Sequence, residues 1–382
     1  MSEEHLPHPR FYKLVVLTLV VLPFLGVITA MVLVWNTYVF PSDIVLFLSL
    51  YLATGLGITI GYHRMLTHQS FRTFTPIKAF FLILGCMAFE GSPLPWAAAH
   101  IKHHAHSDDD GDPHTPLEGF WHSHLGWLFR SEYQNPEVYA PHLLKDPVIV
   151  FVDRFTPLWM IFSLAIPAAI GGWTGLLWGG LVRIFITTHA TWSVNSVCHT
   201  FGKRTFESHD ESRNEWIVGL LAFGEGWHNN HHAFPESAFH GLRWWQFDLS
   251  GLILRSLEAM GLIWNVQRVS GESMEEKRIK AISLREKFDA LKEQLKAHIE
   301  SAEADLAEFF DKNPLPTRKN ISLQKLHINA KSRLHEIRRE IERRKNLREQ
   351  LVERYKKEIA EAVQSAKQRA SQELKQLSGI AA

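Results

Sequence analysis

The sequence predicts an all-α protein in which four transmembrane helices and a cytosolic helical cap precede a charged helical hairpin or coiled coil. Long apolar stretches occur between residues 11 and 180, and charged residues dominate from residue 272 onward. Many of the 22 histidines gather in short clusters that precede the charged part. We therefore expect a membrane domain over residues 1–271 and a charged helical domain over residues 272–382.

The overall charge gives no reason to expect nucleic acid as a partner. Lysine and arginine number 41 against 40 acidic residues, a formal net charge of +1. The 2 cysteines, Cys86 and Cys198, sit in apolar surroundings, which disfavours a disulfide framework. The first apolar segment is too long for a cleavable signal peptide, so we interpret it as the first membrane span.

Four segments are long and apolar enough to cross about 30 Å of hydrocarbon. They cover residues 11–35, 41–62, 148–171 and 174–197. The turns at residues 36–40 and 172–173 contain no lysine or arginine, so the positive-inside rule places both turns away from the cytosol. The cap and both termini then face the cytosol, from a multi-pass protein in the inner, cytoplasmic membrane. Arg183 and His189 in the fourth span should point inward.

Three further segments are predicted to be helical without spanning the membrane. Residues 77–89 are too short to cross and should dip into the membrane or lie buried. Residues 244–264 should form an interfacial helix, because Arg255 and Glu258 interrupt its apolar face. Over residues 272–377 we expect two long helices folded back at the prolines of 313–317, or a coiled coil that joins two copies into a homo-oligomer.

The histidines form three boxes and one isolated position, all on the predicted cytosolic side. They are His63 and His68; His100, His103 and His104; His228, His231 and His232; and His199, which follows Asn195 by four residues. Positions i, i+3 and i+4 share one helical face, so the second and third boxes should each present three imidazoles to one point. The five-residue step of the first box shares no face of an ideal helix, so its histidines serve different metals or straddle a helix end.

Nine such imidazoles are too many for one metal ion and suit two. Neutral imidazole binds iron, zinc, copper or nickel. A hydrolytic zinc site needs only three ligands and an open position, and no HExxH is present. A histidine-rich site for two metal ions beside a bilayer therefore favours redox chemistry on a lipid-soluble substrate.

The segments around the boxes resemble the membrane fatty acid desaturases of the stearoyl-CoA/Δ9 type, in its bacterial and cyanobacterial branch. The resemblance covers residues 63–248 and the preceding spans. It rests on GYHRMLTHQSF, HIKHHAHSDDDGDPHTP, FWHSHLGWLFR, ATWSVNSVCHTFGKRTF and FGEGWHNNHHAFP, which occur in the family's order.

The resemblance implies that the nine histidines bind two Fe2+ ions and that Asn195 reaches one of them through a water. No catalytic residue is implied beyond these ligands. Reaction with O2 would place a cis double bond, at Δ9, in an acyl chain carried on CoA or a membrane lipid. Trp96, Thr191 and Trp192 would line the bend of the acyl tunnel, although ordinary core packing explains them too. Glu90 stands where many relatives carry glutamine.

Partners follow from what the sequence lacks. It shows no heme-binding HPGG motif, dinucleotide-binding glycine pattern or iron–sulfur cysteine set, so electrons should come from a ferredoxin or a flavoprotein reductase. The charged C-terminal helices are a candidate docking site for that donor. Asp112 is the best candidate to orient a ligand imidazole, whereas Asp108 fits a solvated loop equally well. The alternatives are a membrane hydroxylase of alkanes or lipids, and a non-enzymatic metal transporter or sensor.

Overall fold

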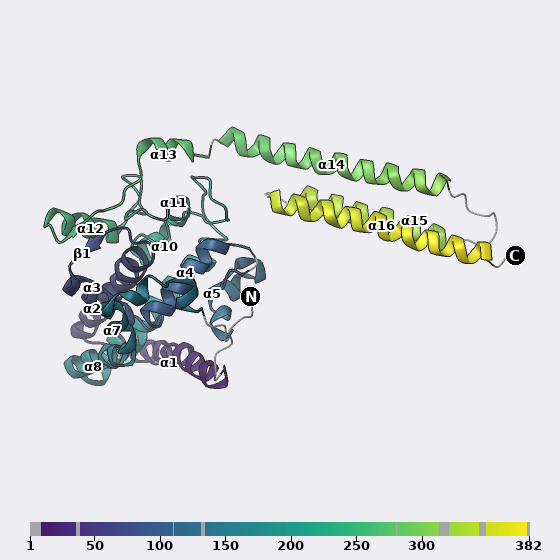
Figure 1. Cartoon of the computed structure of the whole chain (residues 1–382). Coiled ribbons are helices and arrows are strands. Elements are labelled where there is room, and N and C mark those ends of the chain that lie inside the picture. The colour runs from purple at the N-terminus through teal and green to yellow at the C-terminus, as the bar shows by residue number, and fades with distance from the viewer. Residues whose placement is uncertain are drawn as a thin grey trace. The chain divides into compact units, whose positions relative to one another are not determined.

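The structure is a computed structural model that describes residues 9–35, 39–109, 111–130, 134–279, 281–312, 321–343 and 349–379. It is mostly helical and divides into two compact units, Met1–Arg278 and Ile279–Ala382 (Figure 1). In the described residues, the strands are β1 (Arg72–Thr73) and β2 (Ile263–Trp264), which pair antiparallel. Each unit is considered by itself below.

The first unit contains three helical stretches that are long and apolar enough to cross a membrane: Arg10–Val34, Pro41–Thr67 and Thr156–Ser196. The first is α1 (Pro9–Trp35). The second joins α2 (Pro41–Leu56) to the π-helix η1 (Gly57–Thr67), and the third joins α8 (Thr156–Gly175), η5 (Leu176–Val182) and α9 (Arg183–Ser196). Of the expected turn at 36–40, residues 36–38 lie outside the described residues.

The third stretch is broken at Gly172, one of the two residues where a turn was expected. Gly172 has φ +62° and ψ −144°, a conformation that glycine adopts without the Cβ clash of other residues. Beyond Gly172 the chain turns back on itself. Gly175 then lies against Pro167, and a Cβ on Gly175 would lie only 2.3 Å from the carbonyl oxygen of Pro167. The absence of side chains at this glycine lets the two arms pack closely.

The expected span over residues 148–171 begins too early. Residues up to 154 form a separate helix, α7 (Pro147–Arg154), whose first turn is capped by Asp146 Oδ1 accepting from Val148 N at 2.9 Å. Pro157 then stands in the first turn of α8, and it has no N–H with which to continue the hydrogen-bond ladder of α7. The apolar run is therefore divided between two helices.

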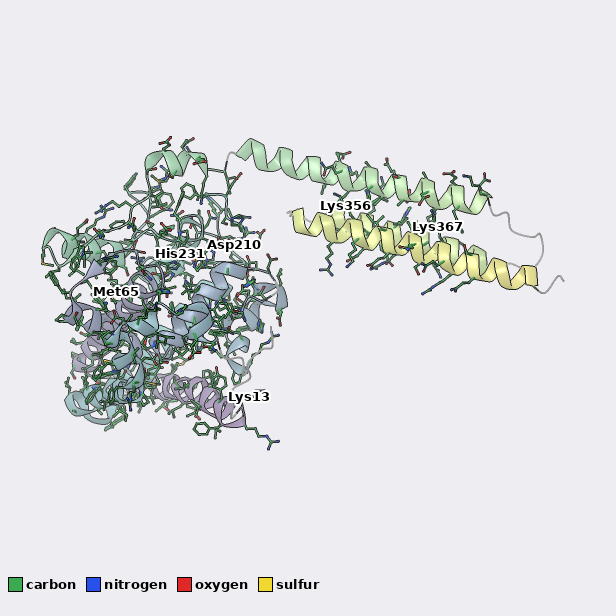
Figure 2. The ribbon with its side chains drawn as sticks, in the orientation of Figure 1. Lys13, Met65, Asp210, His231, Lys356 and Lys367 are labelled. Carbon is green, nitrogen blue, oxygen red and sulfur yellow. The ribbon has the colours of Figure 1, made fainter. Side chains whose placement is uncertain are left out.

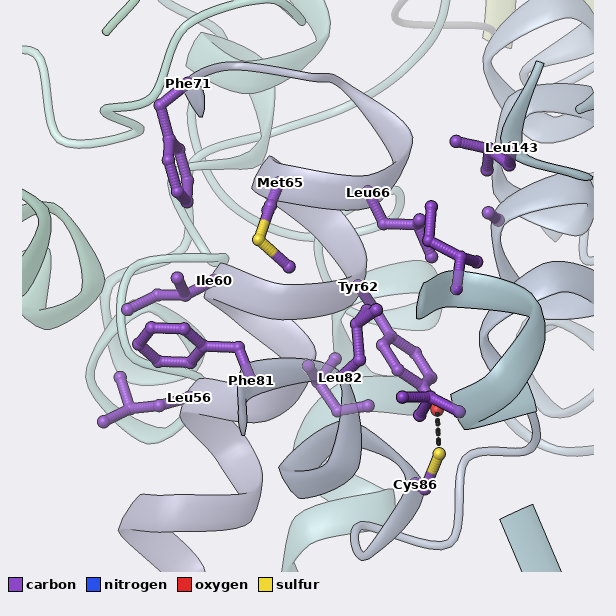
Figure 3. Packing of buried hydrophobic residues seen from close by; sticks show 14 of the residues in the cluster. Leu56, Ile60, Tyr62, Met65, Leu66, Phe71, Phe81, Leu82, Cys86 and Leu143 are labelled. Atoms are coloured by element: carbon purple, nitrogen blue, oxygen red, sulfur yellow. Dashed lines mark hydrogen bonds between the residues drawn. The ribbon is translucent and has the colours of Figure 1, made fainter. Parts of the chain in front are cut away.

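A buried apolar cluster joins α2 and η1 to α3 (Thr75–Cys86), the segment expected to dip or lie buried (Figure 3). Phe81, Leu82 and Cys86 of α3 are buried, and Tyr62 Oη donates to Cys86 Sγ at 3.1 Å. Gly57 permits this contact, because a Cβ there would lie 2.3 Å from the backbone of α3. This packing fixes η1, which carries the first histidine box.

Arg183 points inward, as predicted for a cation within a span. Its guanidinium is buried and donates to the Met87 carbonyl at 2.8 Å, the Ser163 hydroxyl at 2.5 Å and the Gly179 carbonyl at 3.1 Å. Backbone carbonyls therefore satisfy most of its donors. Because Met87 follows α3 directly, Arg183 fixes the end of that helix against α8 and η5.

Short helices make up the cap. They are α4 (Pro93–His106), η2 (Pro116–Glu118), α5 (Phe120–His124), η3 (Gly126–Phe129), α6 (Pro136–Tyr139), η4 (Leu143–Lys145), α10 (Trp216–Leu221), α11 (His228–Ala233), α12 (Leu249–Ala259) and α13 (Gly271–Glu276). The helix expected over residues 244–264 is shorter than predicted. Asp248 caps its start by accepting from Gly251 N at 2.8 Å, and Gly261, at φ +68°, follows its end.

In its described residues the second unit has three helices where two were expected: α14 (Ala281–Lys312), α15 (Ile321–Arg343) and α16 (Glu349–Gly379). Leu295, Leu334 and Tyr355, one from each helix, belong to a shared buried cluster. A two-helix hairpin would leave part of these apolar stripes in water, and the third helix covers it. The proline-containing stretch 313–317 lies outside the described residues.

Replacement of Gly57 by alanine should destabilise the first unit. The added methyl group would overlap the backbone of α3, which cannot move aside as a side chain can, so the cost should reach about 2 kcal/mol or more. Thermal unfolding of the detergent-solubilised protein should therefore occur at lower temperature. Gly271→Ala is the matched control, because open space surrounds that position. Equal melting of the two variants would contradict the packing described here.

Candidate metal centre

The nine histidines singled out in the sequence come together in two groups. In each group the ring nitrogens lie within 4.8 Å of one another. The first group has five members: His63, His68, His100, His104 and His231. The second has four: His103, His199, His228 and His232. Each group has the donor set of one metal centre, since neutral imidazole is a common ligand of transition metals.

The π-helix explains the five-residue step of the first box. In η1 the amide of His68 donates to the carbonyl of His63 at 3.1 Å, a hydrogen bond between residues five apart. On an α-helix these side chains would diverge by about 140°, and the wider turn reduces that angle. Their rings lie 4.8 Å apart in one group, which argues against the alternative that they serve different metals. The other alternative fits, because His63 lies in η1 and His68 is the residue at its C-terminal end.

The expectation that the second and third boxes each present three imidazoles to one point is wrong, because each box is divided between the two groups. On α4, His100 and His104 join the first group while His103 joins the second. On α11 the division is reversed, because only His231 joins the first group. Both helices thus lie between the two groups, where neighbouring faces of one helix can serve two sites.

His199 lies just beyond α9 and completes the second group. It is buried, and its Nε2 lies 3.0 Å from Nε2 of His228. Asn195, one turn earlier on α9, lines a cavity that His228 also lines. Asn195 therefore shares a cavity wall with a member of the second group.

Four carboxylates lie behind the histidines and hold their outer nitrogens. Asp112 accepts from His103 Nδ1 at 3.0 Å, Asp108 from His199 Nδ1 at 3.0 Å, and Glu225 from His63 Nδ1 at 2.5 Å. Asp210 does the same for His232 Nδ1. Such partners fix the tautomer and the orientation of a metal-binding imidazole.

These hydrogen bonds decide which nitrogen faces inward. A carboxylate only accepts, so each held Nδ1 carries the proton and Nε2 presents a lone pair. The Nε2 atoms of His103 and His232 are buried and have no hydrogen-bond partner in the described part of the chain. Buried lone pairs without a donor are costly, and a cation between them removes that cost. The residues present therefore fit a metal ion in each group.

The carboxylates hold their negative charge. Burial opposes ionisation, but the neighbouring histidines outweigh it and lower the pKa values of Asp112 and Asp210 far below the ordinary range. Burial and nearby imidazoles also lower the pKa values of His100, His104, His228 and His231, which keeps these rings neutral. Neutral rings backed by anions are the state that metal binding requires.

A cavity of about 380 Å³ runs beside both groups. His63 and His100 of the first group and His228 of the second line it. The three residues predicted to contact the acyl chain, Trp96, Thr191 and Trp192, line it as well. Trp96 stacks on the ring of His100 with centroids 5.0 Å apart, so the cavity wall continues directly into the metal centre.

Glu90 also lines this cavity, and its Oε1 has no hydrogen-bond partner among the described residues. Burial raises the pKa of its carboxyl group from 4.5 to about 8. The side chain is therefore neutral near pH 7, which suits a largely apolar cavity.

Comparison with known proteins identifies the family of this chain. Residues 42–257 match the family described as "Fatty acid desaturase", which is more than half of the chain. This chain belongs to the fatty acid desaturase family. It is accordingly an oxidoreductase, and neither the hydroxylase nor the metal transporter is favoured.

Relatives of this desaturase differ in the acyl carrier that their names give. A hex-5-enoyl-[acyl-carrier protein] acetylenase of Moorena producens (strain JHB) is 39% identical over 280 residues, 68% of this chain and 87% of that protein. An sn-1 stearoyl-lipid 9-desaturase of Anabaena variabilis is 43% identical over 215 residues, 56% of this chain and 79% of that protein. An acyl-CoA 5-desaturase of Anemone leveillei is 41% identical over 225 residues, 58% of this chain and 70% of that protein.

Sequence reasoning missed part of the desaturase's carboxylate set. Asp112 contacts a ligand candidate as predicted, whereas Asp108 is buried rather than solvated. Glu225 and Asp210 went unnoticed, although Glu225 stands three residues before the third box. His124 does not reach the two groups, and its Nε2 lies 2.9 Å from Nδ1 of His189 in α9. That pair is a separate contact between α5 and α9.

Removal of one histidine from the smaller group should remove one metal ion. We expect His199→Ala to lower the iron bound to the purified protein from about two ions per chain to about one, because the smaller group loses one of its four ligands and the carboxylate-held imidazole that orients it. His209→Ala is the control, since His209 is exposed and belongs to neither group. Metal analysis by inductively coupled plasma mass spectrometry measures both, and unchanged iron in His199→Ala would contradict the assignment.

Proposed function

We propose that this protein is an O2-dependent fatty acyl desaturase that places a cis double bond, at Δ9, in a saturated acyl chain. The nine histidines would hold two iron ions, and Asn195 would reach one of them through a water. The supporting observation is the pair of histidine groups that opens onto a cavity large enough for part of an acyl chain.

The charges of the site support two divalent ions. Nine neutral imidazoles add no charge, so two Fe2+ ions would bring four positive charges into a buried site. The carboxylates of Asp108, Asp112, Asp210 and Glu225 supply four negative charges directly behind the ligands. Arg64 contacts Glu225 at 3.2 Å and Asp248 at 3.1 Å, so Asp248 offsets its charge. The filled site would be close to neutral, as a buried site requires.

The chain's own residues would hold and orient the substrate. An unactivated methylene offers neither charge nor acidic proton, so bound iron must supply the oxidising power for removal of two hydrogens by O2. Trp96, Thr191 and Trp192 would fix which carbons lie beside the histidine groups. Their bulk would also exclude water from the reaction.

The membrane arrangement and the electron supply belong to the same proposal. Four spans, with the break at Gly172 separating the last two, would place the cap and both termini in the cytosol. An external ferredoxin or reductase would deliver the electrons, and the three-helix unit is a candidate for docking it or for joining copies of the chain.

Expression in a host whose lipids are saturated tests the function. We expect monounsaturated fatty acids to appear, and gas chromatography with mass spectrometry of derivatised chains to place the bond at Δ9. Hydroxylated chains in place of alkenes would contradict desaturation. An alkene elsewhere in the chain would keep desaturation and overturn the Δ9 assignment.

Activity should fall as the pH rises through about 8, the raised pKa of Glu90. Above that pH a carboxylate would stand in the acyl cavity and repel an apolar chain. Since the folded-state pKa exceeds the ordinary value of 4.5, the same group makes the folded protein less stable as the pH rises from 4.5 to about 8.

Initial rates across this pH range check the expectation. Glu90→Gln should keep its rate above pH 8, because the amide stays neutral, whereas Glu137→Gln, at an exposed position, should decline like the wild type. The same decline in Glu90→Gln would show that another group causes it.

A further inference from the structure

We infer that the acyl chain enters the cavity from the membrane surface beside α1, and that the substrate is a membrane phospholipid rather than acyl-CoA. This inference rests on the proposed desaturase function, and it concerns the carrier that the relatives leave open. The residues at one end of the cavity carry it.

That end of the cavity reaches a membrane helix. Tyr12, in the first turn of α1, lines the cavity together with Trp127 and Leu128 of η3. The candidate span in α1 begins at Arg10, so Tyr12 lies where the helix leaves the bilayer. The cavity therefore connects the histidine groups to the level of the lipid headgroups.

The surface around this end is apolar. Phe11 on α1 is 68% exposed, Leu117 on η2 is 69% exposed and Trp121 on α5 is 70% exposed. η2 and α5 pack against each other, and α5 and α1 both contact η3, which places these side chains around the cavity end. Large apolar side chains left in the open at a bilayer surface indicate contact with lipid.

On the cap side of this end, where the CoA headgroup would have to bind, the charges do not favour CoA. None of the described residues that line the cavity is a lysine or an arginine. Arg130, which follows η3, is paired with Glu118 through both of its terminal nitrogens, at 2.9 Å for Nη1. CoA carries several phosphate charges, and a cation already neutralised by a carboxylate offers little to them.

Two cations stand instead on the membrane helix itself. Arg10 and Lys13 are exposed in the first turn of α1, on either side of Tyr12. Lys13 lies at the outer edge of the first unit, well away from His231 and Asp210 (Figure 2). At the headgroup level such side chains attract lipid phosphates. A phospholipid whose phosphate meets these cations could pass its acyl chain over Tyr12 into the cavity.

Competition between two labelled substrates tests this inference. Washed membranes from cells that express the full chain would receive phosphatidylglycerol vesicles with deuterated stearoyl chains, together with 13C-labelled stearoyl-CoA. NADPH, ferredoxin and ferredoxin reductase would be added as the source of electrons. Mass spectrometry of intact phospholipid and intact acyl-CoA at short times shows which carrier gains the double bond. We expect the deuterated phospholipid to be desaturated first, and the labelled CoA chain only after its transfer to lipid.

Charge reversal at the cavity end provides the second measurement. Arg10→Glu with Lys13→Glu should slow desaturation of the phospholipid by about fivefold or more, because each surface cation contributes about that factor to the attraction of anionic lipid. Lys145→Glu is the matched control on an exposed cap position and should keep the wild-type rate. Iron content should be equal in all three proteins, which separates substrate access from loss of the metal centre.

The outcomes are distinct. Direct desaturation of intact stearoyl-CoA, with no product in intact phospholipid, would overturn the inference and keep the desaturase function. Equal rates of the charge-reversal variant and the control would contradict the role of α1. Product on stearoyl-[acyl-carrier protein] alone, supplied in a parallel assay, would also overturn the inference and keep the desaturase function. No double bond on any of the three carriers, with iron bound and electrons supplied, would overturn the proposed function itself.

Discussion

The rest of the structure depends on the burial of many imidazole lone pairs close together in the protein interior. Two groups of histidines aim ring nitrogens inward, and carboxylates on the outside hold four rings in the tautomer that makes this unavoidable. An empty arrangement of this kind is unfavourable, because no protein donor among the described residues reaches the buried inner nitrogens of His103 and His232. Metal ions would convert this cost into binding energy, and so link metal loading to the stability of the cap.

The membrane helices serve this centre by fixing the ends of the segments that carry the histidines. Close contact at Gly57 fixes η1 against α3, and the buried Arg183 fixes the end of α3 against α8 and η5. The π-helical turn then supplies both histidines of the first box to one group. The packing of the long apolar helices thus determines the geometry of the histidine groups.

Much of this could be predicted from sequence, for reasons that lie in particular residues. Apolar length identified the helices that can cross a membrane, and the clustering of histidines identified the centre. The division of boxes two and three between two groups could not be predicted, because spacing gives the helical face and not the position of the helix relative to two sites. The π-helix was missed because the i+5 pattern has no local sequence signature of its own. Asp210 and Glu225 were missed because a hydrogen bond to a ring far along the chain produces no periodic pattern in the sequence. In the charged unit, helical spacing was evident, but the number of helices depends on which apolar stripes cover one another.

The most direct test of the central claim is the anomalous X-ray scattering of the iron-loaded protein at the iron absorption edge. The account predicts two peaks, one within the group of His63, His68, His100, His104 and His231 and one within the group of His103, His199, His228 and His232. A single peak, or a peak at the His124–His189 pair with either group empty, would contradict it.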